Sequence, residues 1–191
     1  MTPEQFQKLF AAKLNEMKRY VEEDLPRHIG KLAVDHFQDN FLQGGFVDEA
    51  LMPWLPSRRI GTSRGAAGGY GTLLSSRKEL YNSIRYTASP RKTVVSSAKP
   101  YSRIHNEGGI INQTITITPK MRRFAWAKFY EVNPDGKGDE GGQWKGLALT
   151  KKTAINRTIN MPKRQYMGRS AELNRVIVER LAKDVKRILL T

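Results

Sequence analysis

The sequence predicts an α+β fold in which an antiparallel sheet, made of a hairpin and further strands, packs against N-terminal and C-terminal amphipathic helices and carries long loops. Two observations predict it. Apolar residues recur at spacings of three and four near both ends of the chain, which is typical of helices with one buried face. The middle instead carries short runs rich in Ile, Val and Thr between glycines and prolines. A length of 191 residues with 39% hydrophobic content fits a single domain over residues 1–191.

A pair of helices is expected over residues 1–43. Thr2, which is followed by proline, is a suitable N-cap. Pro26 is expected to break or kink the helical run, because a proline inside a helix removes a backbone donor. The adjacent glycines Gly44 and Gly45 are expected to end the second helix.

Residues 44–72 are expected to form a flexible loop rich in basic residues and glycine. Its first half holds an apolar anchor, Pro53-Trp54-Leu55-Pro56, in extended backbone. Residues 65–71 read GAAGGYG and loosely resemble a phosphate-binding loop, but no strand precedes them and no Lys-Ser or Lys-Thr pair follows. We therefore expect this loop to become ordered against a partner and not to bind a nucleotide.

The centre of the chain predicts a hairpin, with strands over residues 83–89 and 93–97 and a turn at Pro90-Arg91-Lys92. A tight corner follows in residues 101–109, which read YSRIHNEGG. A single helical turn there would place three side chains on one face and end at two glycines. We call these five residues the structural corner: Tyr101, Ile104, His105, Gly108 and Gly109.

The last third of the chain predicts a strand at 110–118, where Ile and Thr alternate, and a helix at 120–132. Residues 133–150 are rich in glycine and polar side chains and are expected to form a polar loop insertion. A further strand is expected at 153–160. The final amphipathic helix begins after Ser170, a suitable N-cap.

We expect no enzyme, no metal site and no cofactor. The chain has no cysteine, which excludes a disulfide framework and a thiol nucleophile. His105-Asn106-Glu107 has the His-x-Glu form of zinc deaminases, but those enzymes also need two cysteines. The acidic residues of the basic part are too few and too scattered to form a paired-carboxylate site.

The charge of the chain is strongly positive and unevenly distributed. The formal net charge is +15, yet residues 1–50 hold six Lys/Arg against nine Asp/Glu. The excess therefore lies in residues 51–191, which carry +18. Such a surface attracts nucleic acid or an acidic protein face, and composition alone leaves both possibilities open. No membrane contact is expected, because no apolar run reaches the roughly 18 residues of a membrane span.

Nine basic residues in the expected loops and turns are the candidates for an interface or a DNA channel: Arg58, Arg59, Arg64, Arg91, Lys92, Lys151, Lys152, Lys163 and Arg164.

The order of four short motifs resembles the tail-completion branch of the phage virion morphogenesis family. They are PWLP at 53–56, LYNSI at 80–84, PYSRIHNEGG at 100–109 and MPKRQYMG at 161–168, followed by the last helix. The resemblance covers the chain from about residue 30 to its C-terminus. Ser102 stands where the family usually has alanine, and residues 119–150 form a long insertion.

The resemblance implies a structural protein of the head–tail junction or of the end of the tail tube. It implies self-association into a homo-oligomeric ring, contacts with neck, connector and tail-tube proteins, and non-specific contact with phage DNA. The expected location is the virion, after assembly in the bacterial host cytoplasm. Tyr101, Ile104 and His105 would then pack inside, and the basic loops would face other subunits or the DNA channel. A DNA- or RNA-binding protein without catalytic activity is the alternative.

Overall fold

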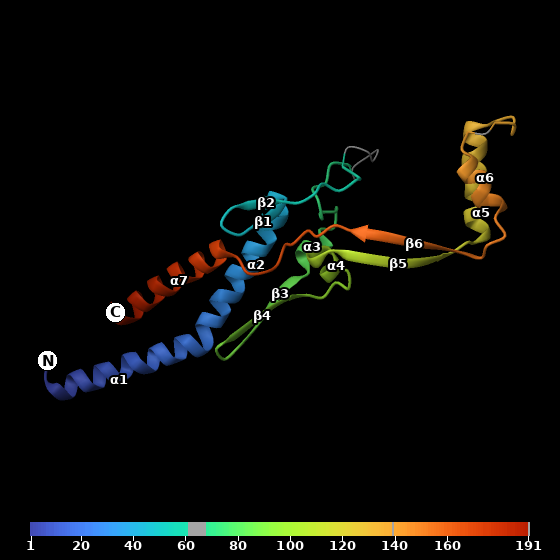
Figure 1. Ribbon diagram of the computed structural model, residues 1–191. Helices are drawn as coiled ribbons and strands as arrows, with labels where there is room; N and C mark the ends of the chain where they lie inside the picture. Colours follow the sequence, from blue (N-terminus) through green and yellow to red (C-terminus); the bar gives the residue numbers. More distant parts are fainter. Residues whose placement is uncertain (61–67, 139, 191) are drawn as a thin grey trace. The chain divides into compact units, whose positions relative to one another are not determined.

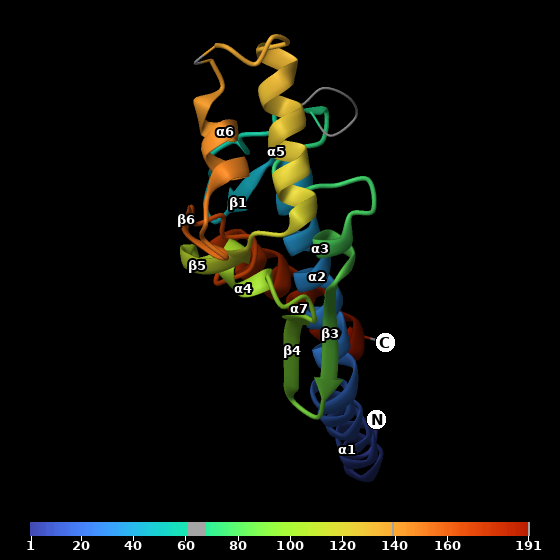
Figure 2. The same ribbon diagram turned by 90° about the vertical axis from the view of Figure 1, so that its right-hand side faces the viewer.

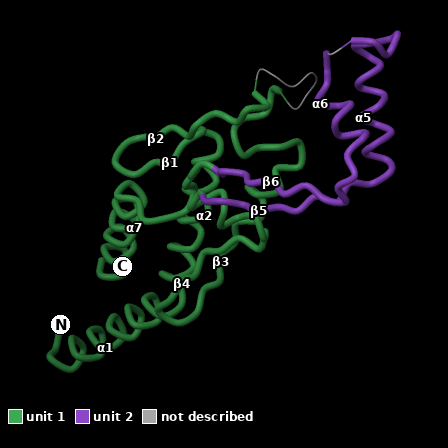
Figure 3. The backbone as a smooth tube through the Cα atoms, turned by 45° about the vertical axis from the view of Figure 1, so that its right-hand side comes forward, with its two compact units in different colours: residues 1–108, 162–191 green, residues 109–161 purple. Residues whose placement is uncertain are grey.

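The computed structural model describes residues 1–60, 68–138 and 140–190. The chain divides into two compact units (Figure 3). Unit 1 comprises residues 1–108 and 162–191, and unit 2 comprises residues 109–161. In the described residues no helix is long and apolar enough to cross a membrane.

Unit 1 is built on a continuous helical run at the N-terminus (Figure 1). Helix α1 (Pro3–Arg19) passes through a π-helical turn (Tyr20–Asp24) into helix α2 (Leu25–Gln43). The helical run does not break at Pro26, but it bends at the π-helical turn that precedes this proline, which agrees with the predicted kink (Figure 1). Because the run is continuous, Pro26 cannot donate to the carbonyl of Glu22, which accepts instead from Arg91 N at 3.3 Å. The N–H of Leu25 donates to the carbonyl of Tyr20.

The ends of this helical run follow the sequence expectation. At the N-terminus, Thr2 Oγ1 accepts from Gln5 N at 3.2 Å while Gln5 Oε1 accepts from Thr2 N at 2.9 Å, a reciprocal cap. At the C-terminus, Gly44 has φ 70°, the left-handed conformation that terminates many helices.

The predicted α+β class is confirmed, and in the part of the chain that the structure describes the strands form three separate antiparallel pairs instead of one sheet. The first pair, β1 (Gly45–Val47) with β2 (Leu51–Pro53), lies inside the region predicted as a loop over 44–72. It forms because Phe46 is buried and Trp54 N donates to Gly44 O at 2.9 Å, which closes the ribbon.

The second pair is the predicted hairpin, β3 (Ile84–Ser89) and β4 (Lys92–Ser97). It lies along the helical run (Figure 2). Thr93 Oγ1 donates to Pro26 O at 2.5 Å, and a β-carbon added at Gly30 would stand 2.2 Å from the Tyr86 ring. Glycine at position 30 is therefore what allows the hairpin to approach α2 so closely.

The core of unit 1 joins α2 to segments from the rest of the unit. Two short helices, α3 (Glu79–Asn82) and α4 (Ser102–Glu107), and the long helix α7 (Ala171–Leu190) complete this unit. The buried residues that pack together are Ala33, Phe37, Phe41, Trp54, Leu80, Ile84, Tyr166 and Leu173.

Helix α7 begins at its predicted cap, since Leu173 N donates to Ser170 Oγ at 3.0 Å. Asp184, whose side chain is buried, ties α7 to the N-terminal helices. Its Oδ2 accepts from Tyr20 Oη at 2.9 Å and from Arg180 Nε at 2.7 Å. Burial and the bond to Asp184 raise the pKa of Tyr20 to about 12, so this phenol remains a donor at neutral pH.

Unit 2 is a two-stranded ribbon that carries a helical hairpin. Strands β5 (Gly109–Thr116) and β6 (Ala154–Met161) pair in antiparallel register over their whole length, from Gly109 opposite Met161 to Thr116 opposite Ala154. Helix α5 (Pro119–Val132), capped by Thr118, follows β5.

The polar loop predicted over residues 133–150 is wrong for its second half, because helix α6 (Gly142–Leu149) forms there. Within this glycine-rich stretch, Trp144 and Ala148 lie one helical turn apart. Ala148 is buried, and the Trp144 ring meets the Phe124 ring of α5 edge to face at 5.9 Å between centroids. Packing against α5 therefore overrides the weak helix propensity of the glycines.

Candidate functional site

Residues of all four sequence motifs meet in unit 1, around the side chain of Tyr166. This side chain is fully buried, and its ring centroid lies 4.9 Å from that of Phe41 on α2. The carbonyl of Tyr166 accepts from Asn40 Nδ2 at 3.1 Å. Burial raises the pKa of the Tyr166 hydroxyl, which stays protonated.

Helix α4 holds the segment 162–168 through hydrogen bonds that span about sixty residues of sequence. Asn106 Oδ1 accepts from the backbone N–H groups of Tyr166 and Met167, both at 2.9 Å. Arg164 N donates to His105 O at 2.8 Å. The Tyr166 hydroxyl lies 2.6 Å from Ser102 Oγ and also donates to the Ser102 carbonyl at 3.2 Å. Helix α4 therefore fixes the backbone that leads into α7.

The PWLP anchor holds the same segment from another direction. Trp54 Nε1 donates to Gln165 O at 2.6 Å, and Arg164 Nε donates to Leu55 O at 2.9 Å. Arg164 Nη2 also reaches Pro56 O at 3.4 Å. With 8% of its surface exposed, Arg164 is a buried structural cation and not part of an open basic surface, where the sequence placed it.

Helix α4 ends at Glu107, and both glycines that follow have positive φ, 74° at Gly108 and 138° at Gly109. Residues with a β-carbon rarely adopt these conformations. The expectation that Tyr101 packs inside is wrong, because 37% of its surface is exposed. Ile104 and His105 are half-buried.

We call the contact between helix α4 and the segment 162–168 the junction. Two of its hydrogen-bonding residues were not singled out from the sequence, although both lie within the quoted motifs. Ser102 is buried in place of Tyr101, and Asn106 supplies the acceptor for two backbone donors. The available signal was a polar side chain in a very short helix beside two glycines, which is typical of side chains that bond to neighbouring backbone.

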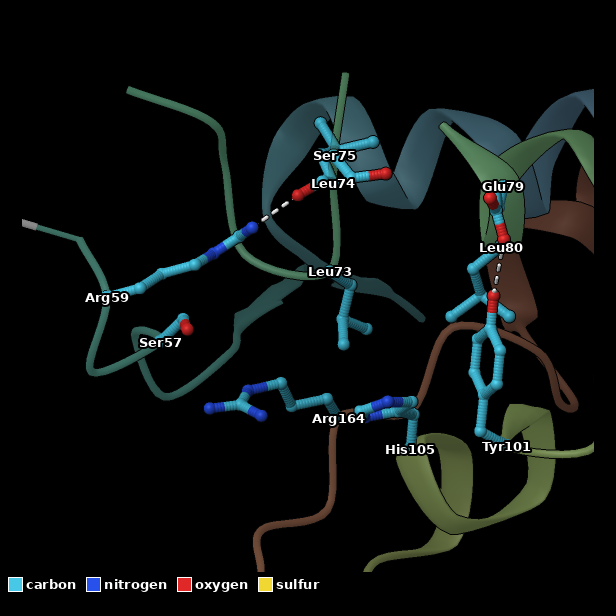
Figure 4. Close-up of a pocket in the computed structure, with 10 residues that line it drawn as sticks. All are labelled: Ser57, Arg59, Leu73, Leu74, Ser75, Glu79, Leu80, Tyr101, His105 and Arg164. Carbon is cyan, nitrogen blue, oxygen red and sulfur yellow. Dashed lines mark hydrogen bonds between the residues drawn. The ribbon is translucent and has the colours of Figure 1, made fainter. Parts of the chain in front are cut away.

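A cavity of about 280 Å³ opens beside the corner, lined by residues of α3, α4 and the segments near residues 57 and 74 (Figure 4). Arg59 and Arg164 give it a positive wall. The Arg59 guanidinium donates to the carbonyls of Gly71 (2.7 Å) and Leu74. Burial, with the nearby Arg59 charge, lowers the pKa of Arg164.

Two further groups that line this cavity have shifted pKa values. Burial, followed by the Arg164 charge, lowers the pKa of His105, so the imidazole is neutral at pH 7, and its Nδ1 is buried without a hydrogen-bond partner. Glu79 accepts from Lys99 Nζ at 3.2 Å and from Tyr101 Oη at 3.4 Å. The Lys99 ammonium holds the pKa of Glu79 below its usual value. Among the described residues, no three His, Asp or Glu side chains come close enough to hold a metal ion.

The other basic candidates are divided between the two units. Arg58, Lys92 and Lys163 are exposed in unit 1, and Lys151 and Lys152 are exposed in unit 2. Arg91 Nη2 is paired with Glu22 Oε1 at 2.5 Å. Arg64 lies outside the residues that the structure describes.

Comparison with known proteins agrees with the motif order. The sequence profile of the phage virion morphogenesis family matches residues 14–186, which is most of the chain. No curated protein and no solved structure matches at a significant level. The matched span includes every residue of the junction around Tyr166. The chain belongs to the phage virion morphogenesis family, and its role lies in building a phage particle.

Proposed function

We propose that this protein completes the phage tail or joins the tail to the head, as a subunit of a homo-oligomeric ring that acts by shape and charge and not by turnover. Family membership supports the assembly role. The hydrogen bonds of the motif residues support a structural role. The polar side-chain atoms of Ser102, Asn106 and Arg164 bond to backbone groups or to a buried hydroxyl of the same unit. Such groups hold a shape and are not available to a substrate.

The proposed partners are other copies of the chain and the neighbouring neck, connector and tail-tube proteins. The exposed Arg58, Lys92 and Lys163 of unit 1 and the lysine pair of unit 2 would meet acidic faces of these neighbours. The same cations would allow salt-dependent, non-specific contact with DNA passing through the ring.

Particles made with and without this gene test the proposal. We expect the protein in purified virions, and we expect its loss to give unjoined heads and tails or tails of abnormal end structure in electron micrographs. Infectious particles of normal form without the protein would overturn it. Replacing Asn106 by alanine should reproduce the defect in part, whereas Asn112→Ala, on the exposed face of β5, serves as the control.

A nucleic-acid-binding protein is the second candidate, favoured by the charge of +18 over residues 51–191. Fluorescence anisotropy with labelled DNA and RNA at several salt concentrations tests it. Submicromolar affinity whose logarithm falls steeply with the logarithm of salt, without self-association and without a place in virions, would favour this alternative over the ring.

A further inference from the structure

Helix α1 and the end of helix α7 leave an uncovered apolar groove in unit 1. The groove has a volume of about 290 Å³, and its lining residues are Phe6, Leu9, Phe10, Lys13, Leu14, Met17 and Leu189. None of the 17 residues of α1 is buried. The Phe6 and Phe10 rings are stacked with centroids 6.2 Å apart, and their exposed fractions are 57% and 61%.

This surface is too apolar to be an ordinary solvated helix face. An isolated helix of this length is marginal in water unless its apolar stripe packs against something. At roughly 200 Å² for each large side chain, the exposed fractions leave on the order of 500 Å² of apolar surface. That is near the upper end for the largest patch on a typical monomer, about 300–600 Å². The groove therefore has the size of an interaction surface.

We propose that a second copy of this chain covers the groove, with the α1 helices of the two copies lying antiparallel and each resting between α1 and α7 of the other. Because the same surface serves both copies, the contact is two-fold. Together the two faces would bury about 1,000 Å² of apolar surface alone, which reaches the minimum size of a biological interface. The inference rests on the proposed function in assuming that copies associate. A two-fold contact cannot recur between neighbours around a ring, so the dimer is the form of the free chain before ring assembly, and the ring contact uses other surfaces.

The charges on α1 favour the antiparallel orientation. Glu4 lies in the first turn, and Lys18 and Arg19 lie in the last turn. A parallel pair would bring like charges together at each end, whereas an antiparallel pair brings the acidic end of one helix to the basic end of the other. It also opposes the two helix dipoles. Lys13 lines the groove with its aliphatic stem, and its ammonium lies 3.8 Å from Glu16 Oε2 of the same helix.

Sedimentation velocity of the full chain tests the pairing. We expect a dimer, and we expect Phe10→Glu combined with Leu14→Glu to weaken dimerisation about 100-fold, because a charge would be placed in the covered face. Asn15→Glu, at an exposed position on the opposite side of α1, should leave the dimer unchanged. Neither site is buried, so circular dichroism should show the same fold in all variants. A wild-type chain that stays monomeric at about 100 µM, or a double variant that dimerises normally, would overturn the inference.

Cross-linking tests the orientation, and the absence of native cysteine makes it specific. Gln7→Cys and Lys18→Cys lie on one flank of α1, about 16 Å apart along the axis. A short bismaleimide should link the two variants when they are mixed and link neither variant to itself. Self-linking of each variant without mixed products would contradict the antiparallel pair. Vesicle binding that depends on Phe10 without any dimer would show that a membrane surface is the occupant. A dimer of a protein that is absent from virions would instead leave the pairing intact and overturn the proposed function.

Discussion

The hydroxyl oxygen of Tyr166 lies 2.6 Å from Ser102 Oγ, although 64 residues separate them in the sequence. Both side chains are buried, with 0% and 8% of their surfaces exposed. The phenol also donates to the Ser102 carbonyl, so one aromatic residue fastens the start of α4 to the segment that enters α7.

Replacing Tyr166 by phenylalanine should lower the free energy of unfolding by about 1–3 kcal/mol, because Ser102 loses its buried partner while the ring packing is retained. Urea denaturation measures this loss. Ser102→Ala should cost less on the Tyr166→Phe background than alone, since the shared bond is then already gone. Tyr130→Phe, at a ring 50% exposed, is the control and should change stability little. Strict additivity of the Ser102 and Tyr166 changes would contradict a direct bond.

Asn106→Ala should destabilise unit 1 by about 2 kcal/mol, because two backbone N–H groups lose their acceptor. In Asn106→Asp a carboxylate oxygen can replace the amide oxygen as the acceptor, so this variant should retain most of the stability at pH 7. The difference between the two variants in urea midpoint isolates the acceptor role. Equal losses in both would mean that the side chain acts through packing alone.

Gly108→Ala and Gly146→Ala should have opposite effects on stability. Gly108 has φ 74° and ψ −175°, a conformation almost confined to glycine, so alanine should cost about 1–3 kcal/mol. Gly146 lies inside α6, where an added β-carbon meets no atom within 4 Å, so alanine should stabilise by about 0.5–1 kcal/mol. Thermal unfolding of the two variants beside the parent checks the signs. A neutral Gly108→Ala would show that the corner relaxes without strain.

Acidification should destabilise unit 1 through His105. Burial holds its pKa below the value of 6.5 that applies in the unfolded chain, so unfolding takes up a proton once the pH falls below about 6.5. The stabilising contribution of the neutral imidazole is complete above that pH and is lost as the pH falls toward the folded pKa. His105→Gln, which does not titrate, should therefore lose less stability between pH 7 and 5 than the parent. Identical slopes in the parent and His105→Gln would contradict this assignment.

Periodic apolar spacing was sufficient to predict the terminal helices and the hairpin around Pro90, because those elements depend on local pattern. Helix α6 was missed because its stability comes from the contact of Trp144 with Phe124, which no local pattern of a glycine-rich stretch reveals. The burial of Arg164 was missed for a related reason. A cation is buried only when acceptors surround it, and its carbonyl acceptors lie 108 and 109 residues earlier in the chain.

The pairing of Gly109 with Met161 means that the backbone departs for unit 2 and comes back at adjacent positions. An excursion closed at its base in this way can grow, shrink or be exchanged for another without re-routing the remaining chain.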